Sequence, residues 1–222
     1  MWIDIGAASR DEAAEIVSLG DVATYQCEFR PLLGDRATAR GFDNKMGTFV
    51  VAETLRLLRQ DGGLHPNVGV YAVATAQEEI ELRGARTASY GNAAGTGLAI
   101  DVNHATDYPG ANETFHGKLK IGEGPCVSRG PNINPVTFDL LTAAAREAGI
   151  AYQVSVSAGG TGTDANAMQL NRAGMATGLI GVPLRYMPTP VELLSLRDVE
   201  ECARLMAGYC RQVTPETDFT PR

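Results

Sequence analysis

The chain has 222 residues, of which 44% are hydrophobic and 20% are charged, and its formal net charge is −7. This length supports one sizeable hydrophobic core and about one to two domains. The acidic balance comes without basic clusters or interleaved aromatics, which argues against nucleic acid or an anionic membrane surface as a partner. No apolar run approaches the roughly 18 residues that a membrane-spanning helix needs. The expected partners are therefore small molecules or short peptides.

Strand and helix patterns alternate along the chain. Strands are predicted at residues 22–29, 67–76, 97–103, 151–158 and 175–183, and helices at 46–60, 79–90, 134–150, 163–174 and 196–213. Apolar strands flanked by helices indicate an α/β fold, a three-layer sandwich of a mostly parallel mixed sheet with helices on both faces. The four cysteines show no CxxC spacing and follow no secretory signal, so we expect reduced thiols in a cytoplasmic protein.

Acidic residues occur at the margins of three of these elements. Asp43 precedes a helix in "GFDNKMG", Glu78 and Glu79 follow the strand 67–76, and Asp101 ends the strand 97–103. Each has an ordinary explanation: a helix N-cap for Asp43, first-turn acids favoured by the helix dipole for the glutamates, and a turn start for Asp101. In α/β folds, however, functional side chains collect at the carboxyl ends of strands. Together the four carboxylates resemble a cation-binding cluster.

Seven stretches match one known family in the family's own order, from residue 2 to about residue 200. They are "WIDIGAASRDEA", "FDNKMG", "QEEIELRGARTA", "AIDVNHATDYPG", "GEGP", "GGTGTDANAMQLNRAG" and "IGVPLRYMPTPVELLSLRDVE". The chain thus resembles the glutamyl aminopeptidase and endoglucanase-M-like family of dinuclear metallo-aminopeptidases, peptidase family M42. By this resemblance "GGTGTDANA" lines the active-site pocket, although Thr163 or Asp164 in it can equally be read as a helix cap.

The resemblance implies a role for each of the four acids. Asp43 corresponds to the aspartate that bridges two divalent metal ions, zinc or cobalt, while Glu79 corresponds to a ligand of one metal and Asp101 to a ligand of the other. Glu78 corresponds to the general base. Neighbouring glutamates would then do different work, because one holds a cation while the other takes a proton from the attacking water.

The chain departs from the family pattern at both histidine ligands. The upstream HxD stretch is missing, and the "RYxHSP" loop reads "RYMPTP" here, with Pro188 at the histidine position. His104 is a candidate substitute, against the alternative of an ordinary loop histidine. An oxygen-only ligand set suits Mg²⁺, Mn²⁺ or Ca²⁺ better than Zn²⁺. We therefore expect no metal or one weakly bound hard cation.

The resemblance also implies that the chain consists of three units. Residues 1–40 correspond to the remnant of a small β-rich, PDZ-like inserted domain used for dimerisation, residues 41–213 to the catalytic-type α/β domain, incomplete on its N-terminal side, and residues 214–222 to a tail. Family members form large homo-oligomers, so self-association is expected.

The sequence thus predicts a metal-dependent aminopeptidase that removes N-terminal residues from short peptides, weak or inactive as this chain. One alternative is an inactive homologue that binds peptide or a protein partner. A glycoside hydrolase is a remote alternative, because two carboxylates that flank a sugar must stand roughly 5 Å or more apart on opposite sides, which adjacent glutamates do not readily do.

Overall fold

The central sheet has four strands in the order β3–β6–β4–β5. Their bounds are β3 Thr96–His104, β6 Ala176–Leu184, β4 Cys126–Arg129 and β5 Gln153–Val156. β3 pairs parallel to β6 and β4 parallel to β5, whereas β4 and β6 are antiparallel. The sheet is therefore mixed, as predicted, and the predicted strands at 97–103, 151–158 and 175–183 are confirmed within a few residues. β4 was not predicted. This computed structural model describes residues 2–221.

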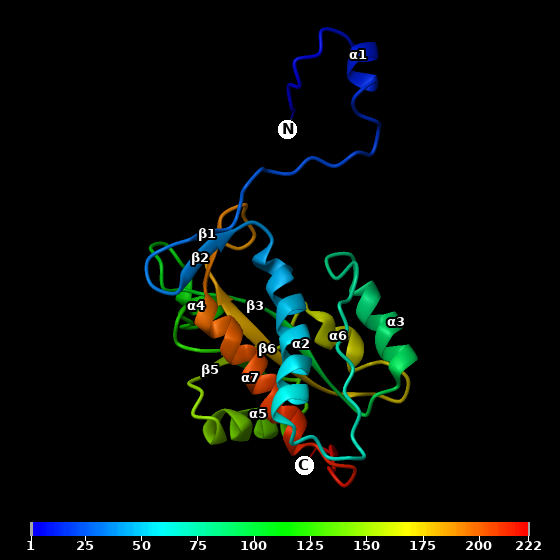
Figure 1. Cartoon of the computed structure of the whole chain (residues 1–222), viewed down its shortest axis with the longest axis vertical. Helices are drawn as coiled ribbons and strands as arrows, with labels where there is room; N and C mark the ends of the chain where they lie inside the picture. The colour runs from blue at the N-terminus through cyan, green and yellow to red at the C-terminus, as the bar shows by residue number, and fades with distance from the viewer. Residues whose placement is uncertain (1, 222) are drawn as a thin grey trace.

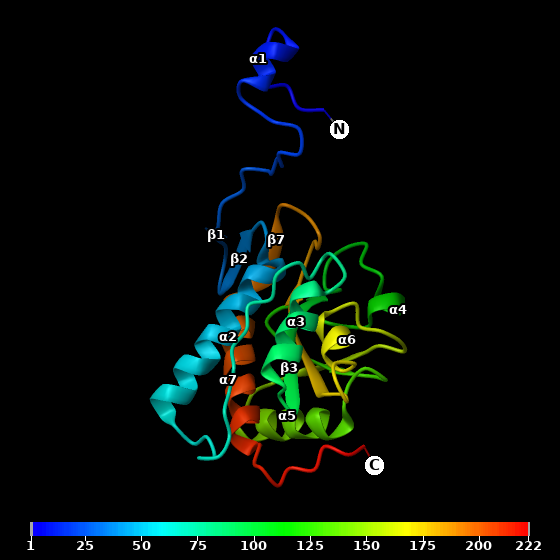
Figure 2. The same cartoon turned by 90° about the vertical axis from the view of Figure 1, so that its right-hand side faces the viewer.

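Helices cover both faces of this sheet (Figures 1 and 2). α2 (Phe42–Asp61), α5 (Pro135–Glu147) and α7 (Leu196–Gln212) lie on one face, and α3 (Arg83–Asn92) and α6 (Asp164–Met168) lie on the other. Side chains alternate between the faces of a strand. Ile180 and Val182 of β6 accordingly pack into the larger core with α2, α5 and α7, while Leu179 packs with Ala165 of α6. The three-layer α/β sandwich is confirmed. No helix within residues 2–221 is long and apolar enough to cross a membrane.

A second, smaller sheet contains the strands that precede α2 and α7. It consists of β1 (Arg30–Pro31), β2 (Arg36–Ala39) and β7 (Glu192–Ser195), paired antiparallel in the order β1–β2–β7. β2 is followed after two residues by α2, and β7 leads directly into α7. Strand pairing between β2 and β7 therefore sets the beginnings of these two helices side by side. None of these strands was predicted, because each has four residues or fewer and no alternating pattern of its own.

Residues 2–29 form an arm that projects away from the body of the molecule in both views (Figures 1 and 2). It carries only the short helix α1 (Arg10–Ala14). The predicted strand at 22–29 is wrong: these residues pair with no strand, and the ladder begins at Arg30. The alternation there was real, but no neighbouring backbone lies beside the segment to pair with it. Met1 and Arg222, which belong to the predicted first and last units, lie outside the described residues.

Residues 67–76 also do not form the predicted strand. They run as an extended, largely exposed segment outside the sheet, although their sequence is rich in β-branched and apolar residues. A cavity lies between this segment and β3, and both contribute to its walls. The two backbones are thus too far apart for a hydrogen-bonded ladder, and β3 remains an edge strand among the strands described. A segment with high β propensity forms a strand only where a neighbouring strand is close enough to pair with it.

The predicted helices are confirmed in position but differ in length. α2, α5 and α7 agree with the predictions closely, whereas α3 begins at Arg83 and α6 ends at Met168. The four residues before α3 form turns in which Glu81 and Leu82 have positive φ. A side chain at Gly84 would run into the backbone of Ala76, so glycine lets α3 approach the extended segment. The remaining helix, α4 (Glu113–His116), is a single turn.

Candidate functional site

Asp43 and Asp101 come from different elements that meet at the start of α2. Asp43 lies in the first turn of α2, where its own backbone and that of Asn44 are not helical, and Asp101 lies within β3. The Asn44 side-chain amide donates to the Ile100 carbonyl oxygen at 2.9 Å and to Asp101 Oδ1 at 3.1 Å. The ordinary explanations are wrong for both acids, since Gly41 is the N-cap and Asp101 begins no turn.

Glu78 and Glu79 lie in the turns between the extended segment and α3. Because α3 begins only at Arg83, neither glutamate is in the first turn of a helix, and the helix-dipole explanation is wrong as well. The Glu78 side chain is half-buried and contributes to the cavity wall, whereas Glu79 is exposed. Adjacent glutamates therefore have different surroundings.

The charges of these acids act on one another. Burial, followed by the charges of Glu79 and Glu192, raises the pKa of Asp43 to about 6. Burial raises the pKa of Glu78 to about 7, with added repulsion from Glu79, Asp164 and Asp43. The four predicted acids thus belong to one electrostatically coupled cluster.

Asp101 belongs to the same cluster. Burial raises its pKa to about 7; a hydrogen bond from the Val102 amide opposes this, and the charges of Glu78, Asp43 and Asp164 add to it. Such mutual repulsion favours retention of protons by some of these carboxyls near neutral pH.

The structure adds two acidic residues that the sequence prediction did not include. Glu192 of β7 is 3% exposed, and its Oε2 accepts a hydrogen bond from the Asp43 amide at 3.2 Å. Asp164 begins α6, and its Oδ2 accepts from the Thr75 hydroxyl at 2.6 Å. The other oxygen, Oδ1, is buried without a hydrogen-bond partner among the described residues. The sequence offered only weak indications of these two residues: a single glutamate in the otherwise uncharged stretch "PTPVELL" and an aspartate in a glycine-rich loop.

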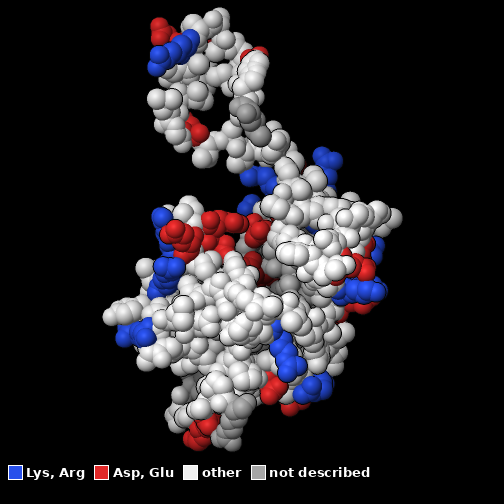
Figure 3. All heavy atoms as spheres, turned by 180° about the vertical axis from the view of Figure 1, so that it is seen from behind, with Lys and Arg blue, Asp and Glu red and all other residues white. Residues whose placement is uncertain are grey.

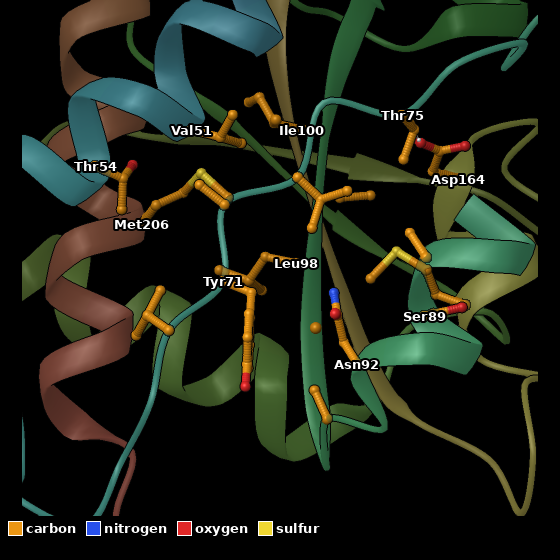
Figure 4. A pocket seen from close by; sticks show the side chains of 18 of the residues that line it. Val51, Thr54, Tyr71, Thr75, Ser89, Asn92, Leu98, Ile100, Asp164 and Met206 are labelled. Carbon is orange, nitrogen blue, oxygen red and sulfur yellow. Dashed lines mark hydrogen bonds between the residues drawn. The ribbon is translucent and has the colours of Figure 1, made fainter. Parts of the chain in front are cut away.

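A cavity of about 280 Å³ opens beside the cluster. Figure 4 shows it between α2, the extended segment, β3 and α3, with Thr75 and Asp164 together at one end. Its walls are mainly apolar and include Val51, Leu98 and Ile100. Seen from behind, acidic side chains gather on the body close to where the N-terminal arm leaves it (Figure 3).

The cluster supplies only carboxylate oxygens as ligands. Among residues 2–221, no group of three or more histidine, cysteine, aspartate and glutamate side chains is arranged to hold a metal ion. The side chains as they lie therefore do not fit a two-metal centre. All four cysteines are free thiols, and Cys126 and Cys202 are buried in the core.

The histidine candidates lie away from the cluster's ligand positions. His104, at the end of β3, stacks against His116 of α4 with ring centroids 4.3 Å apart. Burial, followed by the charge of His116, lowers the pKa of His104. Pro188 is exposed in the loop between β6 and β7. Neither position provides an imidazole to the acidic cluster.

Comparison with known proteins identifies a family that covers the residues of this site. Residues 1–205 match the family described as M42 glutamyl aminopeptidase. The chain is 37% identical to the lysyl aminopeptidase of Pyrococcus furiosus over 222 residues, which cover 99% of this chain and 61% of that protein.

Two solved structures are similar in fold. The TET aminopeptidase of Thaumarchaeota archaeon SCGC AB-539-E09 is 34% identical, with a TM-score of 0.88, over 96% of this chain and 60% of that one. The TET1 peptidase of Pyrococcus horikoshii, which can assemble into a tetrahedron or a large octahedral shell, is 26% identical with a TM-score of 0.77, over 95% and 60% of the two chains.

The chain thus spans about three fifths of the length of these relatives. The family match covers more than nine tenths of the chain and includes every acidic residue of the cluster. This chain belongs to the M42 glutamyl aminopeptidase family.

Proposed function

We propose that this chain acts as an aminopeptidase that hydrolyses N-terminal residues from short peptides, with low activity in the form described. The observation that carries the proposal is the coupling of Asp43, Glu78 and Asp101 at one site, from three separate parts of the fold, at the positions that the family resemblance indicated. Relatives of the chain are named aminopeptidases, which supports the same reaction class.

In this proposal Glu78 is the proton carrier. A carboxylate beside the scissile bond can take a proton from the attacking water and pass it to the departing amine. Glu78 suits this because it is half-buried and faces the cavity, where a peptide amide can approach it. The Asp101 carboxylate accepts a hydrogen bond from the Asn44 side-chain amide, and the backbone amide of Asp43 donates to Glu192 of β7; in this proposal Asp43 and Asp101 bind rather than transfer protons.

Whether the acidic cluster binds divalent metal ions distinguishes an active aminopeptidase from an inactive homologue. Aminopeptidases of this family are in general dinuclear metal enzymes. Here Asp43, Glu79 and Asp101 are the candidate ligands, but no ligand group is formed among residues 2–221 and no imidazole faces the cluster. We infer that binding is limited to one weakly held hard cation, and this favours low activity. A peptide-binding protein without catalysis is the second candidate, supported by the same observation.

A test measures hydrolysis of an aminoacyl-p-nitroanilide panel by the full chain with Mn²⁺, Co²⁺, Zn²⁺ or EDTA. The aminopeptidase proposal predicts slow release of nitroaniline with an added cation, strongest with Mn²⁺, and its loss in EDTA. Peptide binding by calorimetry without hydrolysis under any condition would instead support the inactive homologue. Hydrolysis of a polysaccharide in place of the nitroanilides would overturn both.

We also propose that the chain self-associates through its N-terminal arm. The arm exposes several large apolar side chains, among them Trp2 at 78% and Leu19 at 101% exposure, and their burial against a second copy would remove this apolar surface from water. Light scattering of the full chain and of a chain that begins at Arg30 tests this. A monomeric full chain at micromolar concentration would contradict it.

A further inference from the structure

His104 and His116 form a close pair outside the acidic cluster. His104 ends β3, His116 ends the single-turn helix α4, and their ring centroids lie 4.3 Å apart with the ring planes tilted by 43°. Both residues are half-buried. Within residues 2–221 the two rings contact each other, and His116 also contacts Phe115, but neither ring forms a hydrogen bond or an ion pair. Their ring nitrogens are therefore available to a bound group.

The third histidine of the chain provides a comparison. His65 is half-buried like the pair, yet its Nδ1 accepts a hydrogen bond from the Asn67 amide at 3.2 Å. Buried polar groups are in general hydrogen-bonded. Half-burial alone thus does not explain why both imidazoles of the pair lack a protein partner.

The pair lies on the wall of a hollow of about 300 Å³ that is separate from the cavity beside the acidic cluster. No charged side chain of the described residues lines this hollow, and its other polar groups are the Asn103 amide and the hydroxyls of Ser128, Ser155, Ser157, Thr161 and Thr163. Hard cations such as Mg²⁺ and Ca²⁺ are bound mainly through carboxylates, which are missing here. The hollow therefore offers imidazole nitrogens and neutral oxygens.

The spacing of the two rings suits a metal ion between them. With metal–nitrogen bonds of about 2.0–2.1 Å, two imidazoles at adjacent positions of one ion have ring centroids roughly 4.5 Å apart. The observed separation is 4.3 Å. Burial, followed by the charge of His116, lowers the pKa of His104, which keeps this ring neutral near neutral pH. The neutral imidazole is the form that binds metals.

We propose that His104 and His116 bind one divalent ion of the class that prefers imidazole, Zn²⁺, Ni²⁺ or Cu²⁺, at a site separate from the acidic cluster. Water and the hydroxyl oxygens of the hollow complete the coordination. The ion joins α4 to the end of β3 and so fixes residues 105–112, which connect them. This site is independent of the proposed aminopeptidase function.

The two sites differ in the ions that they prefer. Carboxylate oxygens suit Mn²⁺, whereas imidazole nitrogens suit Zn²⁺, Ni²⁺ and Cu²⁺. Mn²⁺ is therefore the probe for the acidic cluster, and Ni²⁺ is the probe for the histidine pair.

Calorimetric titration of the untagged full chain with Ni²⁺, after removal of bound metal, tests the site. His104→Gln and His116→Gln should each weaken Ni²⁺ binding by at least about tenfold, since even residues that only support a metal ligand contribute that much. His65→Gln is the matched control and should bind Ni²⁺ like the unmodified chain. No Ni²⁺ binding by the unmodified chain, unchanged affinity in either variant of the pair, or an equal loss in His65→Gln would overturn the proposal.

Two further measurements show whether an effect is local to the pair. All three variants should give the same Mn²⁺ titration as the unmodified chain and should melt at its temperature in EDTA. If a variant of the pair melts earlier in EDTA, its loss of Ni²⁺ binding reflects a damaged fold, and the decision rests on the unmodified protein.

Diethylpyrocarbonate, which acylates neutral imidazole nitrogens, provides this test on the unmodified chain. Zn²⁺ should protect His104 and His116 from modification and leave His65 reactive, as read by mass spectrometry of proteolytic peptides, and Mn²⁺ should protect none of the three. Equal modification of His104 and His116 with and without Zn²⁺, or equal protection of all three histidines, would show that the pair binds no metal ion.

Discussion

Asn44 fixes the position of the acidic cluster through three hydrogen bonds. Its amide donates to the Ile100 carbonyl and to Asp101, and its Oδ1 accepts from the Gly47 amide at 2.9 Å. A Cβ atom at Gly47 would collide with this side chain, so the glycine makes room for it. One asparagine therefore joins the start of α2 to β3 and orients Asp101.

Replacing Asn44 tests how much its hydrogen bonds contribute to the free energy of unfolding. Asn44→Ala removes all three hydrogen bonds and leaves buried groups unpaired, so the free energy of unfolding should fall by about 1–3 kcal/mol. Denaturant titration of the variant, with the exposed Asn67→Ala as control, measures the effect. A loss no larger than that of the control would show that Asn44 does not connect these elements.

Sequence patterns identified the acids but not their supporting residues. Asp43, Glu78, Glu79 and Asp101 were found because they follow recognisable motifs and lie at element margins. Asn44 and Glu192 act through contacts across 57 and 149 positions of the chain, which no local pattern encodes. Asp164 was ambiguous, because an aspartate at a helix start is as compatible with a cap as with a binding site.

At the scale of elements, burial separates the correct predictions from the wrong ones. β3 and β6 were predicted well because nine consecutive residue pairs join them and β6 is buried along almost its whole length. The segment 67–76 has a similar composition, yet it lies outside the sheet, with a cavity between it and β3. Composition predicts the tendency to extend, but whether a partner strand lies within reach depends on the fold.

Hydrogen exchange should show the difference between these two apolar segments directly. Within the described chain none of the amides of residues 69–75 donates a hydrogen bond, whereas β6 pairs with β3 along its whole length and also with β4 at Ile180 and Gly181. We expect the amides of 69–75 to exchange orders of magnitude faster than those of 178–182, since unpaired amides need no opening event. Similar protection in both segments would mean that 69–75 pairs with a strand in solution.

At the scale of the whole molecule, the raised pKa values make stability depend on pH. Asp43 has a pKa of about 6 in the folded protein, and Glu78 and Asp101 have values of about 7, against ordinary values near 4. Burial also raises the pKa of Asp198, in the first turn of α7 outside the cluster, to about 6. Between about pH 4 and pH 7 the folded protein therefore binds more protons than the unfolded chain. The free energy of unfolding consequently falls as the pH rises through this window.

Thermal unfolding in EDTA at pH 5.0, 6.0 and 7.5 checks this dependence. The melting temperature should be highest at pH 5.0 and lowest at pH 7.5, and Asp101→Asn should flatten the slope because an amide does not titrate. Added Mn²⁺ should restore part of the loss at pH 7.5 if the cluster binds a cation. A melting temperature that rises with pH would contradict the raised pKa values of these buried acids.

The central claim is that the coupled acids form a hydrolytic site in which Glu78 carries the proton. The most direct measurement compares kcat/KM for aminoacyl-p-nitroanilides, with Mn²⁺ present, among the unmodified chain, Glu78→Gln and the matched control Glu81→Gln, whose side chain is exposed outside the cluster. We predict that Glu78→Gln lowers kcat/KM by about a hundredfold or more, because an amide cannot accept the proton, and that Glu81→Gln equals the unmodified chain. Indistinguishable rates for the unmodified chain and Glu78→Gln, including no hydrolysis by either, would contradict the account.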